Sequence, residues 1–316
     1  NDMILSSGER CAAFVLDKAI QQAIGPSLFY DDLTVCGPHG NAKIVSVGNL
    51  EDTGLPCIVV PGFFGYDERD TIKTIGVSGS DITAAAMARA LEAEQVVIYT
   101  DVKGIFTADP NKVPTAQFIP VMQQWDAIEL GYAGGNVLHP RTTAFLLDTG
   151  IDLYVRHFEE DEGGTLVTQQ TDARCLALST VRNQIMVTVQ GQHMHGIPGV
   201  ASELFDDLGI RGISVTMITQ SCSETSISFA IDEADIDVLV NVADVVDIQK
   251  IGILTLVGSD MKRTVGVAAR LFGLLADGNI NVVAISQGGT ERSISVAVRR
   301  EQILDALRRV HDGLIL

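Results

Sequence analysis

The sequence has few of the features that mark membrane, secreted or nucleic-acid-binding proteins. It contains no run of about 18 uncharged apolar residues, and its amino terminus lacks the basic and then apolar pattern of a signal peptide. Basic residues are scarce, since 22 Lys and Arg stand against 40 Asp and Glu and the formal net charge is −18. A nucleic-acid binder needs a basic face that displaces counterions from phosphates. We therefore expect no membrane and no nucleic-acid partner, and a cytoplasmic location.

Cysteines and clustered metal ligands are also sparse. The five cysteines are widely spaced and form no CxxC pair, which in a cytosolic chain predicts buried free thiols rather than disulfides or a metal site. His193 and His195 are a close histidine pair, but no third ligand lies near them in the sequence. A loop or strand end explains this pair better than a metal site does.

The first half of the chain alternates apolar runs with helical stretches. Three apolar runs predict buried strands, at residues 55–65, 95–101 and 151–158. Two runs of helix formers predict helices, at residues 80–94 and 121–132. This alternation predicts an α/β fold with a mostly parallel sheet covered by helices. An acidic, glycine-containing stretch then changes the composition and predicts a domain boundary near residues 165–175.

The second half repeats itself at an offset of 67 residues. Phe205 and Leu208 recur as Phe272 and Leu275, and the segment SISFAI recurs as SISVAV. Each copy predicts a strand, a helix and two strands joined by a hairpin, and the second copy continues into a further helix. This is the βαββαβ plan of a ferredoxin-like module. Two copies predict paired domains rather than a solenoid.

One short stretch, TIGVSGSDITAA at residues 74–85, places glycines and hydroxyl residues directly before a predicted helix. Glycines let the backbone approach an anion, and the amides at a helix start point toward it. Such a loop suits a phosphate. A glycine-serine turn whose helix is capped by Ser80 or Asp81 is the commoner origin of such a hexapeptide, so both interpretations stay open on the residues alone.

Motifs spread along the chain carry a family resemblance. They are SSGER, VVPGFFG, GVSGSDITAAAMARAL, YTDVKGIFTADPNKV, NVLHPRT and GGTLV. In their order and spacing the chain resembles the aspartate kinases of the amino-acid kinase family, and the repeats resemble that family's tandem ACT domains. The segments ITQSCSETSISF and ISQGGTERSISV are most similar to threonine-sensitive members. The resemblance implies a partial amino-acid-kinase fold in residues 1–168 and ferredoxin-like ACT domains in residues 178–245 and 246–316.

The resemblance implies phosphoryl transfer from Mg-ATP to the side-chain carboxylate of L-aspartate, the first step of lysine, threonine and methionine biosynthesis. Such chemistry needs two anions held in line and the developing charge neutralised. By the family's motifs, Asp81 would be the catalytic acid that organises the cations, and Gly79 and Ser80 would lie near the phosphates and substrate. Glu9 would meet the amino group of aspartate.

The nucleotide and effector sites follow from the same resemblance. Thr100, Asp101, Phe106 and Asp109 would line the nucleotide pocket, and Asn136 would lie near the nucleotide phosphates. Gln220 and Gln287, at matching positions of the repeats, would contact an amino-acid effector, threonine rather than lysine, because an amide both donates to and accepts from a hydroxyl. Alternatively, each glutamine belongs to its hairpin alone. Edge strands of ACT modules pair between chains, so a homo-oligomer is expected.

The sequence departs from the family pattern where positive charge is expected. The family opens with a strand and a Lys-Gly-Gly motif that this chain lacks, so we expect an N-terminally incomplete kinase domain. Val77 replaces an arginine that grips the substrate carboxylate, and Asn111 and Asn136 replace an arginine and a lysine. Lys73 and Lys103 lie close by in sequence and could supply charge.

These departures leave a second interpretation open. A non-catalytic amino-acid sensor could keep the kinase scaffold as a platform, with Asp81 as a helix cap, Glu9 as a solvent-facing acid and Phe106 as a core residue. A third interpretation, a binding module for another protein, rests on the acidity alone.

Overall fold

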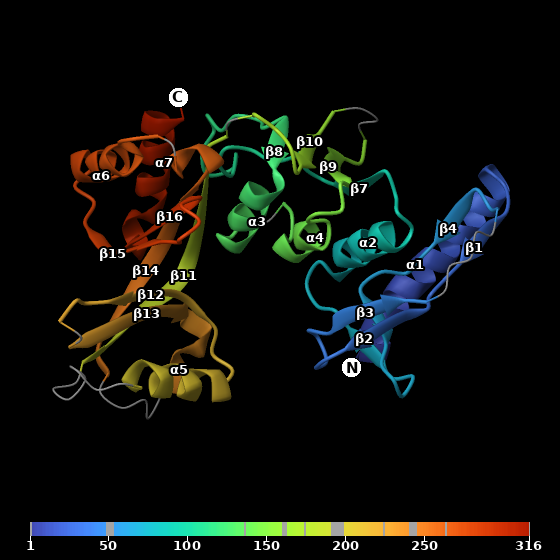
Figure 1. The fold of residues 1–316 in the computed structure, drawn as a ribbon, viewed down its shortest axis with the longest axis horizontal. Coiled ribbons are helices and arrows are strands. Elements are labelled where there is room, and N and C mark those ends of the chain that lie inside the picture. The colour runs from blue at the N-terminus through green and yellow to red at the C-terminus, as the bar shows by residue number, and fades with distance from the viewer. Residues whose placement is uncertain are drawn as a thin grey trace. The chain divides into compact units, whose positions relative to one another are not determined.

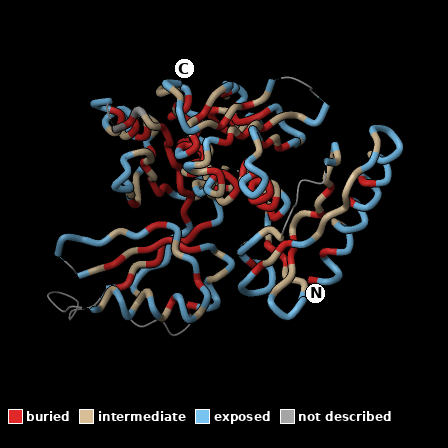
Figure 2. The backbone as a smooth tube through the Cα atoms, turned by 45° about the vertical axis from the view of Figure 1, so that its right-hand side comes forward, coloured by how far each residue is buried: buried red, intermediate tan, exposed pale blue. Residues whose placement is uncertain are grey.

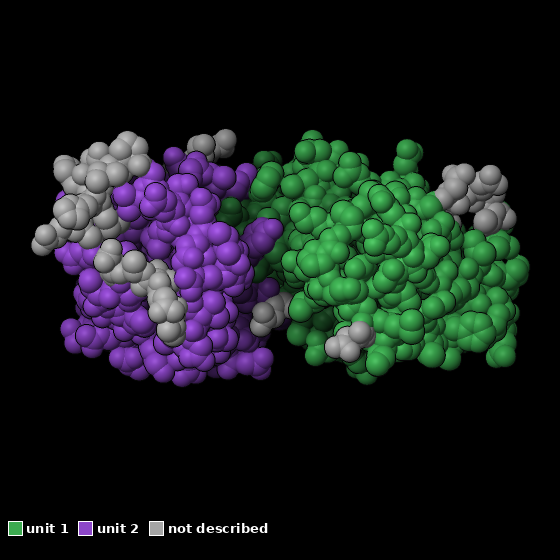
Figure 3. All heavy atoms as spheres, turned by 90° about the horizontal axis from the view of Figure 1, so that it is seen from below, with its two compact units in different colours: residues 1–105, 120–131, 136–172 green, residues 106–119, 132–135, 173–316 purple. Residues whose placement is uncertain are grey.

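The computed structural model describes the chain in two compact units. The described ranges are residues 2–48, 54–135, 137–159, 163–173, 175–190, 199–223, 225–239, 245–262 and 264–315. Unit 1 contains residues 1–105, 120–131 and 136–172, and unit 2 contains residues 106–119, 132–135 and 173–316 (Figures 1 and 3). In the described parts of the chain, no helix combines the length and apolarity needed to cross a bilayer.

Unit 1 begins with a long helix and two small sheets. They consist of α1 (Asp2–Ala23), β1 (Ser27–Phe29), β2 (Leu33–Cys36), β3 (Lys43–Val47), β4 (Cys57–Val59), β5 (Phe64–Tyr66) and β6 (Ile72–Thr74). β1 pairs with β4 in parallel, and the other sheet has the order β3-β2-β5-β6. In this sheet β2 and β5 are parallel, whereas the other two pairings are antiparallel.

The rest of unit 1 forms a helix-covered sheet with the order β7-β9-β10-β8. Its elements are α2 (Gly79–Ala90), β7 (Gln95–Thr100), β8 (Val121–Gln123), α3 (Gln124–Tyr132), α4 (Pro140–Phe145), β9 (Asp152–His157) and β10 (Thr165–Thr168). β7 and β9 are parallel, as are β10 and β8, but β9 and β10 are antiparallel. Unit 1 is therefore mixed α/β with a parallel pair in each of its sheets, which confirms the predicted α/β fold class.

Unit 2 is built on one six-stranded sheet with the order β12-β13-β11-β14-β16-β15. Its elements are β11 (Ala177–Gln190), α5 (Val200–Ile210), β12 (Val215–Gln220), β13 (Ser226–Asp232), η1 (Glu233–Leu239), β14 (Val245–Val257), η2 (Ser259–Lys262), α6 (Val267–Asp277), β15 (Val282–Gln287), β16 (Ser293–Arg299), η3 (Arg300–Gln302) and α7 (Ile303–Leu314). The two copies of the sequence repeat thus share a single sheet.

The long central strands join the two copies. The first part of β11 pairs with the end of β14, from Ala177 opposite Val257, and the second part of β11 pairs with the start of β14, to Val189 opposite Val245. Each long strand therefore serves both modules. The repeat is visible at side-chain level, because the hydroxyl pairs Thr188–Ser228 and Thr255–Ser295 are both 2.9 Å long.

Several sequence expectations were wrong in detail. Residues 121–132 begin with β8 before the helix, because Val121–Gln123 pairs with β10. β7 is covered on one face rather than two, since its residues alternate in burial and Tyr99 is 59% exposed. The long helix α1 is exposed along most of its length (Figure 2). The cysteines are free, but Cys175 is buried whereas Cys11, Cys36 and Cys222 are exposed.

Candidate active site

The loop of residues 76–81, between β6 and α2, is shaped by glycines. Gly76 has a φ of 100°, and a Cβ there would meet the carbonyl oxygen of Gly40. A Cβ on Gly79 would lie 2.9 Å from the Cα of Phe63. Two neighbouring backbone segments therefore pass too close for any larger side chain, so the loop is held in one path.

The start of α2 differs from the expected cap. Ser78 is the N-cap in a left-handed conformation, and its side chain makes no capping hydrogen bond. Ser80 and Asp81 lie inside the first turn, so the expectation that one of them caps the helix was wrong. The reason is that the left-handed turn at Gly76 and Ser78 starts the helix at Gly79, before the two expected cap residues. A first turn without a side-chain cap suits an anionic ligand.

Asp81 is a partly buried carboxylate without a compensating group. Burial raises its pKa, and among the described residues no hydrogen bond or ion pair reaches it. Ser80, directly before it, is exposed. A carboxylate in this situation gains from a bound cation, because a positive charge offsets the cost of desolvation.

The PGFFG turn forms one wall of the loop. A Cβ on Gly62 would lie 2.7 Å from the Cα of Ser80, and the carbonyl of Phe63 accepts a 2.7 Å hydrogen bond from the amide of Ile75. Phe63 adopts a φ of 76°, which is uncommon for a non-glycine residue. The sequence did not single out Phe63. The signal available was an aromatic pair between two glycines.

Residues 37–42 form a second wall. The amides of Gly40 and Ala42 donate to the side-chain and backbone oxygens of Thr74, both at 3.1 Å. Arg141, from the VLHPRT motif, donates to the carbonyl of Ala42 at 3.3 Å. His139 caps α4 by accepting from the amide of Arg141, and its pKa is lowered by burial and by the charge of Arg141. The motif thus braces the loop from α4.

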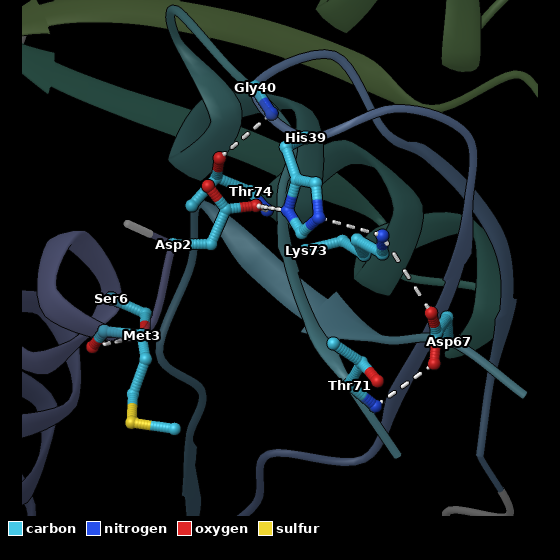
Figure 4. Close-up of polar contacts among 9 residues, drawn as sticks. All are labelled: Asp2, Met3, Ser6, His39, Gly40, Asp67, Thr71, Lys73 and Thr74. Atoms are coloured by element: carbon cyan, nitrogen blue, oxygen red, sulfur yellow. Dashed lines mark hydrogen bonds and ion pairs between the residues drawn. The ribbon is translucent and has the colours of Figure 1, made fainter. Parts of the chain in front are cut away.

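A polar network that the sequence did not predict underlies this wall (Figure 4). Asp2 accepts a 2.9 Å hydrogen bond from the amide of Thr74 and lies 2.7 Å from Nδ1 of His39. The other ring nitrogen of His39 is 3.0 Å from Nζ of Lys73, which lies 3.9 Å from Asp67. Burial opposes ionisation of Asp2, but its hydrogen bonds with Thr74 and His39 prevail and lower its pKa. Lys73 is therefore already engaged by His39 and Asp67.

Glu9 lies two helical turns after Asp2 on α1, so the two residues share a face of that helix. It is partly buried, and α1 packs against β6, the strand that leads into the loop. Among the described residues, no hydrogen bond or ion pair joins Glu9 to Ser80 or Asp81. The structure thus packs the helix that carries Glu9 against the strand that leads into the loop.

Thr100 and Asp101 lie at the carboxyl end of β7, where open α/β sheets hold ligands. The hydroxyl of Thr100 donates to Asp101 at 3.1 Å, and the amide of Phe158 donates to the carbonyl of Thr100 at 3.0 Å. Phe158 follows the neighbouring parallel strand β9, and its ring stacks on His157. Two strand ends therefore converge at this edge.

Phe106 and Asp109 lie in a segment that belongs to unit 2. The ring of Phe106 meets that of Phe118 edge to face, with centroids 5.7 Å apart. Burial would raise the pKa of Asp109, but the amide of Asn111 and the charge of Lys112 lower it overall. Asp109 therefore organises its own turn. Asn136, like the pair His193 and His195, lies outside the described residues.

Gln220 and Gln287 end equivalent strands of the two modules. Both are exposed, and they lie opposite Ile227 and Ile294, which are themselves repeat equivalents. The helices of both copies start with a left-handed glycine, Gly199 with φ 99° and Gly266 with φ 93°. The two strand ends thus have matching local geometry.

Comparison with known proteins identifies the family. Residues 1–157 match the amino acid kinase family, and residues 187–243 and 254–314 match the ACT domain. Aspartokinase of Geobacillus stearothermophilus is 32% identical over 336 residues, covering 99% of this chain and 81% of that protein. The chain belongs to the aspartokinase family.

Solved structures agree with the aspartokinase assignment. E. coli aspartokinase III in complex with aspartate and ADP has a TM-score of 0.87 at 27% identity, covering 100% of this chain and 76% of that one. Bifunctional relatives are longer than this chain. Bifunctional aspartokinase/homoserine dehydrogenase 1 of Zea mays is 33% identical over 350 residues and covers 100% of this chain. The chain spans 34% to 38% of the length of the bifunctional relatives from Zea mays, Haemophilus influenzae and Daucus carota.

The departures from the aspartokinase pattern have structural counterparts. Val77 is 84% exposed in the loop, and it carries no charge. Within the described ranges, no group of three or more His, Cys, Asp or Glu side chains is placed to hold a metal ion.

Proposed function

We propose that this chain phosphorylates the side-chain carboxylate of L-aspartate with Mg-ATP, giving 4-phospho-L-aspartate as the first step of lysine, threonine and methionine biosynthesis in the cytoplasm. The observation that carries the proposal is the partly buried carboxylate of Asp81 on a glycine-shaped loop at an uncapped helix start. The similarity to an aspartokinase III bound to aspartate and ADP supports it.

Asp81 is the residue that would hold Mg²⁺. Its carboxylate fits a hard cation, since burial raises its pKa and no described group compensates its charge. When bound, Mg²⁺ neutralises charge on the transferring phosphoryl group. In the proposal, Gly79 lets the backbone approach the phosphates, Ser80 donates to them, and Glu9 binds the ammonium of aspartate.

The proposed nucleotide site lies beyond the carboxyl end of β7. In the proposal, Thr100 and Asp101 contact the nucleotide at this edge, Phe106 and Asp109 also contact it, and Asn136 binds its phosphates. The support for this assignment is the TDVKGIFTADP motif, whose first residues end a strand of a parallel pair.

The proposed regulation acts through the ACT modules. Gln220 and Gln287 would contact threonine, because their amides can bond its hydroxyl in both directions. A related aspartokinase III was solved with lysine and aspartate, so lysine is the competing effector to test. The modules would also join chains into a homo-oligomer through their sheet edges.

The test is a trapping assay on the purified chain. Mg-ATP and L-aspartate are supplied, and any acyl phosphate is captured by hydroxylamine as the coloured hydroxamate. We expect product that depends on both substrates and that Asp81→Asn abolishes. Glu68→Gln, which replaces an exposed acid of unit 1, serves as the matched control and should keep the activity of the parent.

A folded chain that binds threonine but makes no hydroxamate would refute the kinase proposal and establish the alternative, an amino-acid sensor on a kinase scaffold. Val77 is the observation behind this alternative, because the loop carries an exposed valine where the family has a cation. Thermal shifts with threonine and with lysine then decide the effector, and stabilisation by lysine alone would overturn the threonine assignment.

A further inference from the structure

His311 is a fully buried ionisable residue that has no part in the proposed chemistry. It lies on α7, and its side chain is 0% exposed. Buried histidines need hydrogen-bond partners for their ring nitrogens. The partners of His311 come from a segment about two hundred residues earlier in the chain, so these contacts join α7 to a distant part of the sequence.

The ring of His311 is bonded to Thr107. Nε2 lies 2.9 Å from the hydroxyl oxygen of Thr107, which also accepts a 2.8 Å hydrogen bond from the amide of Gln117. We assign the ring proton to Nδ1, which faces the acceptor-only carboxylate of Asp312, so the Thr107 hydroxyl donates to Nε2 while it accepts from Gln117. Nδ1 in turn lies 3.4 Å from the hydroxyl of Thr115 and 3.5 Å from Asp312.

The rest of α7 holds the same segment. Nε of Arg308 donates to the carbonyl of Lys112 at 2.9 Å, and the hydroxyl of Thr115 donates to Asp312 at 3.1 Å. Ala108 and Val113 are buried in one apolar cluster with Leu307 and Val310 of the helix and other residues of unit 2. Residues 106–119 consequently pack as a part of unit 2 (Figure 3).

Thr107 is the centre of these contacts. Its amide donates to the carbonyl of Gln117 at 2.8 Å, and its carbonyl accepts from the amide of Leu178 at 2.7 Å. The bond to His311 therefore fixes a residue whose backbone is already bonded on both sides. Phe106 directly precedes Thr107, and Asp109 follows two positions later.

We infer that His311 is a positioning residue for the nucleotide site: through Thr107 it fixes the segment that carries Phe106 and Asp109. The inference rests on the proposed function, in which these two residues line the nucleotide pocket. Its consequence is that the last helix of the ACT region sets the affinity for the adenine nucleotide.

The experiment uses the full chain and two independent measurements. His311→Leu removes the acceptor but keeps apolar volume, His311→Gln keeps a polar group near the position of Nε2, and Thr107→Val removes the hydroxyl from the other side. Asp305→Asn is the matched control, since Asp305 is exposed on α7 and pairs with Arg309 of the same helix. Hydrogen exchange reports the amides of residues 107–117, and calorimetry gives the dissociation constants of Mg-ADP and of L-aspartate.

We expect His311→Leu and Thr107→Val to speed exchange in residues 107–117 and to raise the dissociation constant of Mg-ADP about fivefold to tenfold. Aspartate binding stays unchanged, His311→Gln recovers most of the affinity, and Asp305→Asn behaves as the parent. Unchanged hydrogen exchange in both His311→Leu and Thr107→Val would show that His311 does not hold the segment of residues 107–117. Faster exchange with unchanged ADP affinity would overturn its role in positioning. If the parent fails to bind ADP, the proposed nucleotide site is refuted, while the exchange data still decide whether His311 holds the segment of residues 107–117.

Discussion

Replacing Val77 by arginine would place a cation in the loop that, in the proposed function, holds the aspartate substrate. Val77 precedes the helix start at Ser78, and Asp81 lies one turn further along. In the proposed reaction the aspartate substrate brings a carboxylate to this loop, and no cationic side chain of the loop meets it. Lys73 cannot take this role as placed, because it lies between His39 and Asp67.

The size of the effect follows from the exposure of the site. Val77 is 84% exposed, so its replacement removes almost no packing and changes stability by no more than about 0.5 kcal/mol. A charge-assisted hydrogen bond between arginine and a carboxylate contributes about 1.5–3 kcal/mol, and water at an exposed loop reduces this. We expect a value just below this range, about 1.4 kcal/mol, which is a tenfold gain in aspartate affinity.

Calorimetric titration of L-aspartate into Val77→Arg and the parent measures this gain directly. Val77→Gln is the matched control, because it adds length and polarity without charge, and it should bind as the parent does. The gain should shrink as salt rises, since exposed charges are screened. Equal affinities of Val77→Arg and Val77→Gln, or a gain that salt leaves untouched, would refute the assignment of this loop to the substrate carboxylate.

Two further substitutions probe the loop. Asp81→Asn should raise stability at pH 7, because burial raises the pKa of Asp81; water reaches part of this side chain and keeps the gain below about 1 kcal/mol. The stability that the raised pKa contributes is full below the ordinary pKa near 3.9 and is lost as pH rises through the raised value, so the variant should gain on the parent at pH 7 but not at pH 3.5. Melting curves at both pH values test this, and a variant less stable than the parent at pH 7 would contradict it. Gly76→Ala should cost about 1–3 kcal/mol, since its φ is 100° and the Cβ would meet the carbonyl of Gly40, whereas Gly8→Ala in open space on α1 should not lower the melting temperature.

Sequence patterns predicted the parts of the fold that depend on local periodicity. The helix at Gly79–Ala90 and the strand at Asp152–His157 follow from runs of helix formers and apolar residues, and the repeat follows from identities at a fixed offset. The direction of strand pairing did not follow, since β9 and β10 are antiparallel and no hydrophobic periodicity encodes the direction in which a strand runs.

Long-range polar contacts account for what the sequence missed at the site. Asp2 and His39 meet across 37 positions, and Thr107 and His311 meet across 204, so no local pattern indicates either pair. The cap of α2 was misassigned for a different reason. Ser78 in a left-handed conformation is uncommon, and a rule based on average preferences selects Ser80 or Asp81 instead.

The two ACT modules carry the same residue at one pair of equivalent strand ends but different residues at an equivalent pair of positions where the modules contact each other. Glu233 and Arg300 occupy equivalent positions of the repeat, and they pair with each other at 2.6 Å. Lys250 bonds the same carboxylate at 2.8 Å, and these two bonds outweigh burial and lower the pKa of Glu233. A pair of identical residues at this place would repel or leave a charge unpaired. The contact between modules therefore requires different residues at the equivalent positions Glu233 and Arg300. Gln220 and Gln287 are not part of this contact, so it does not require them to differ.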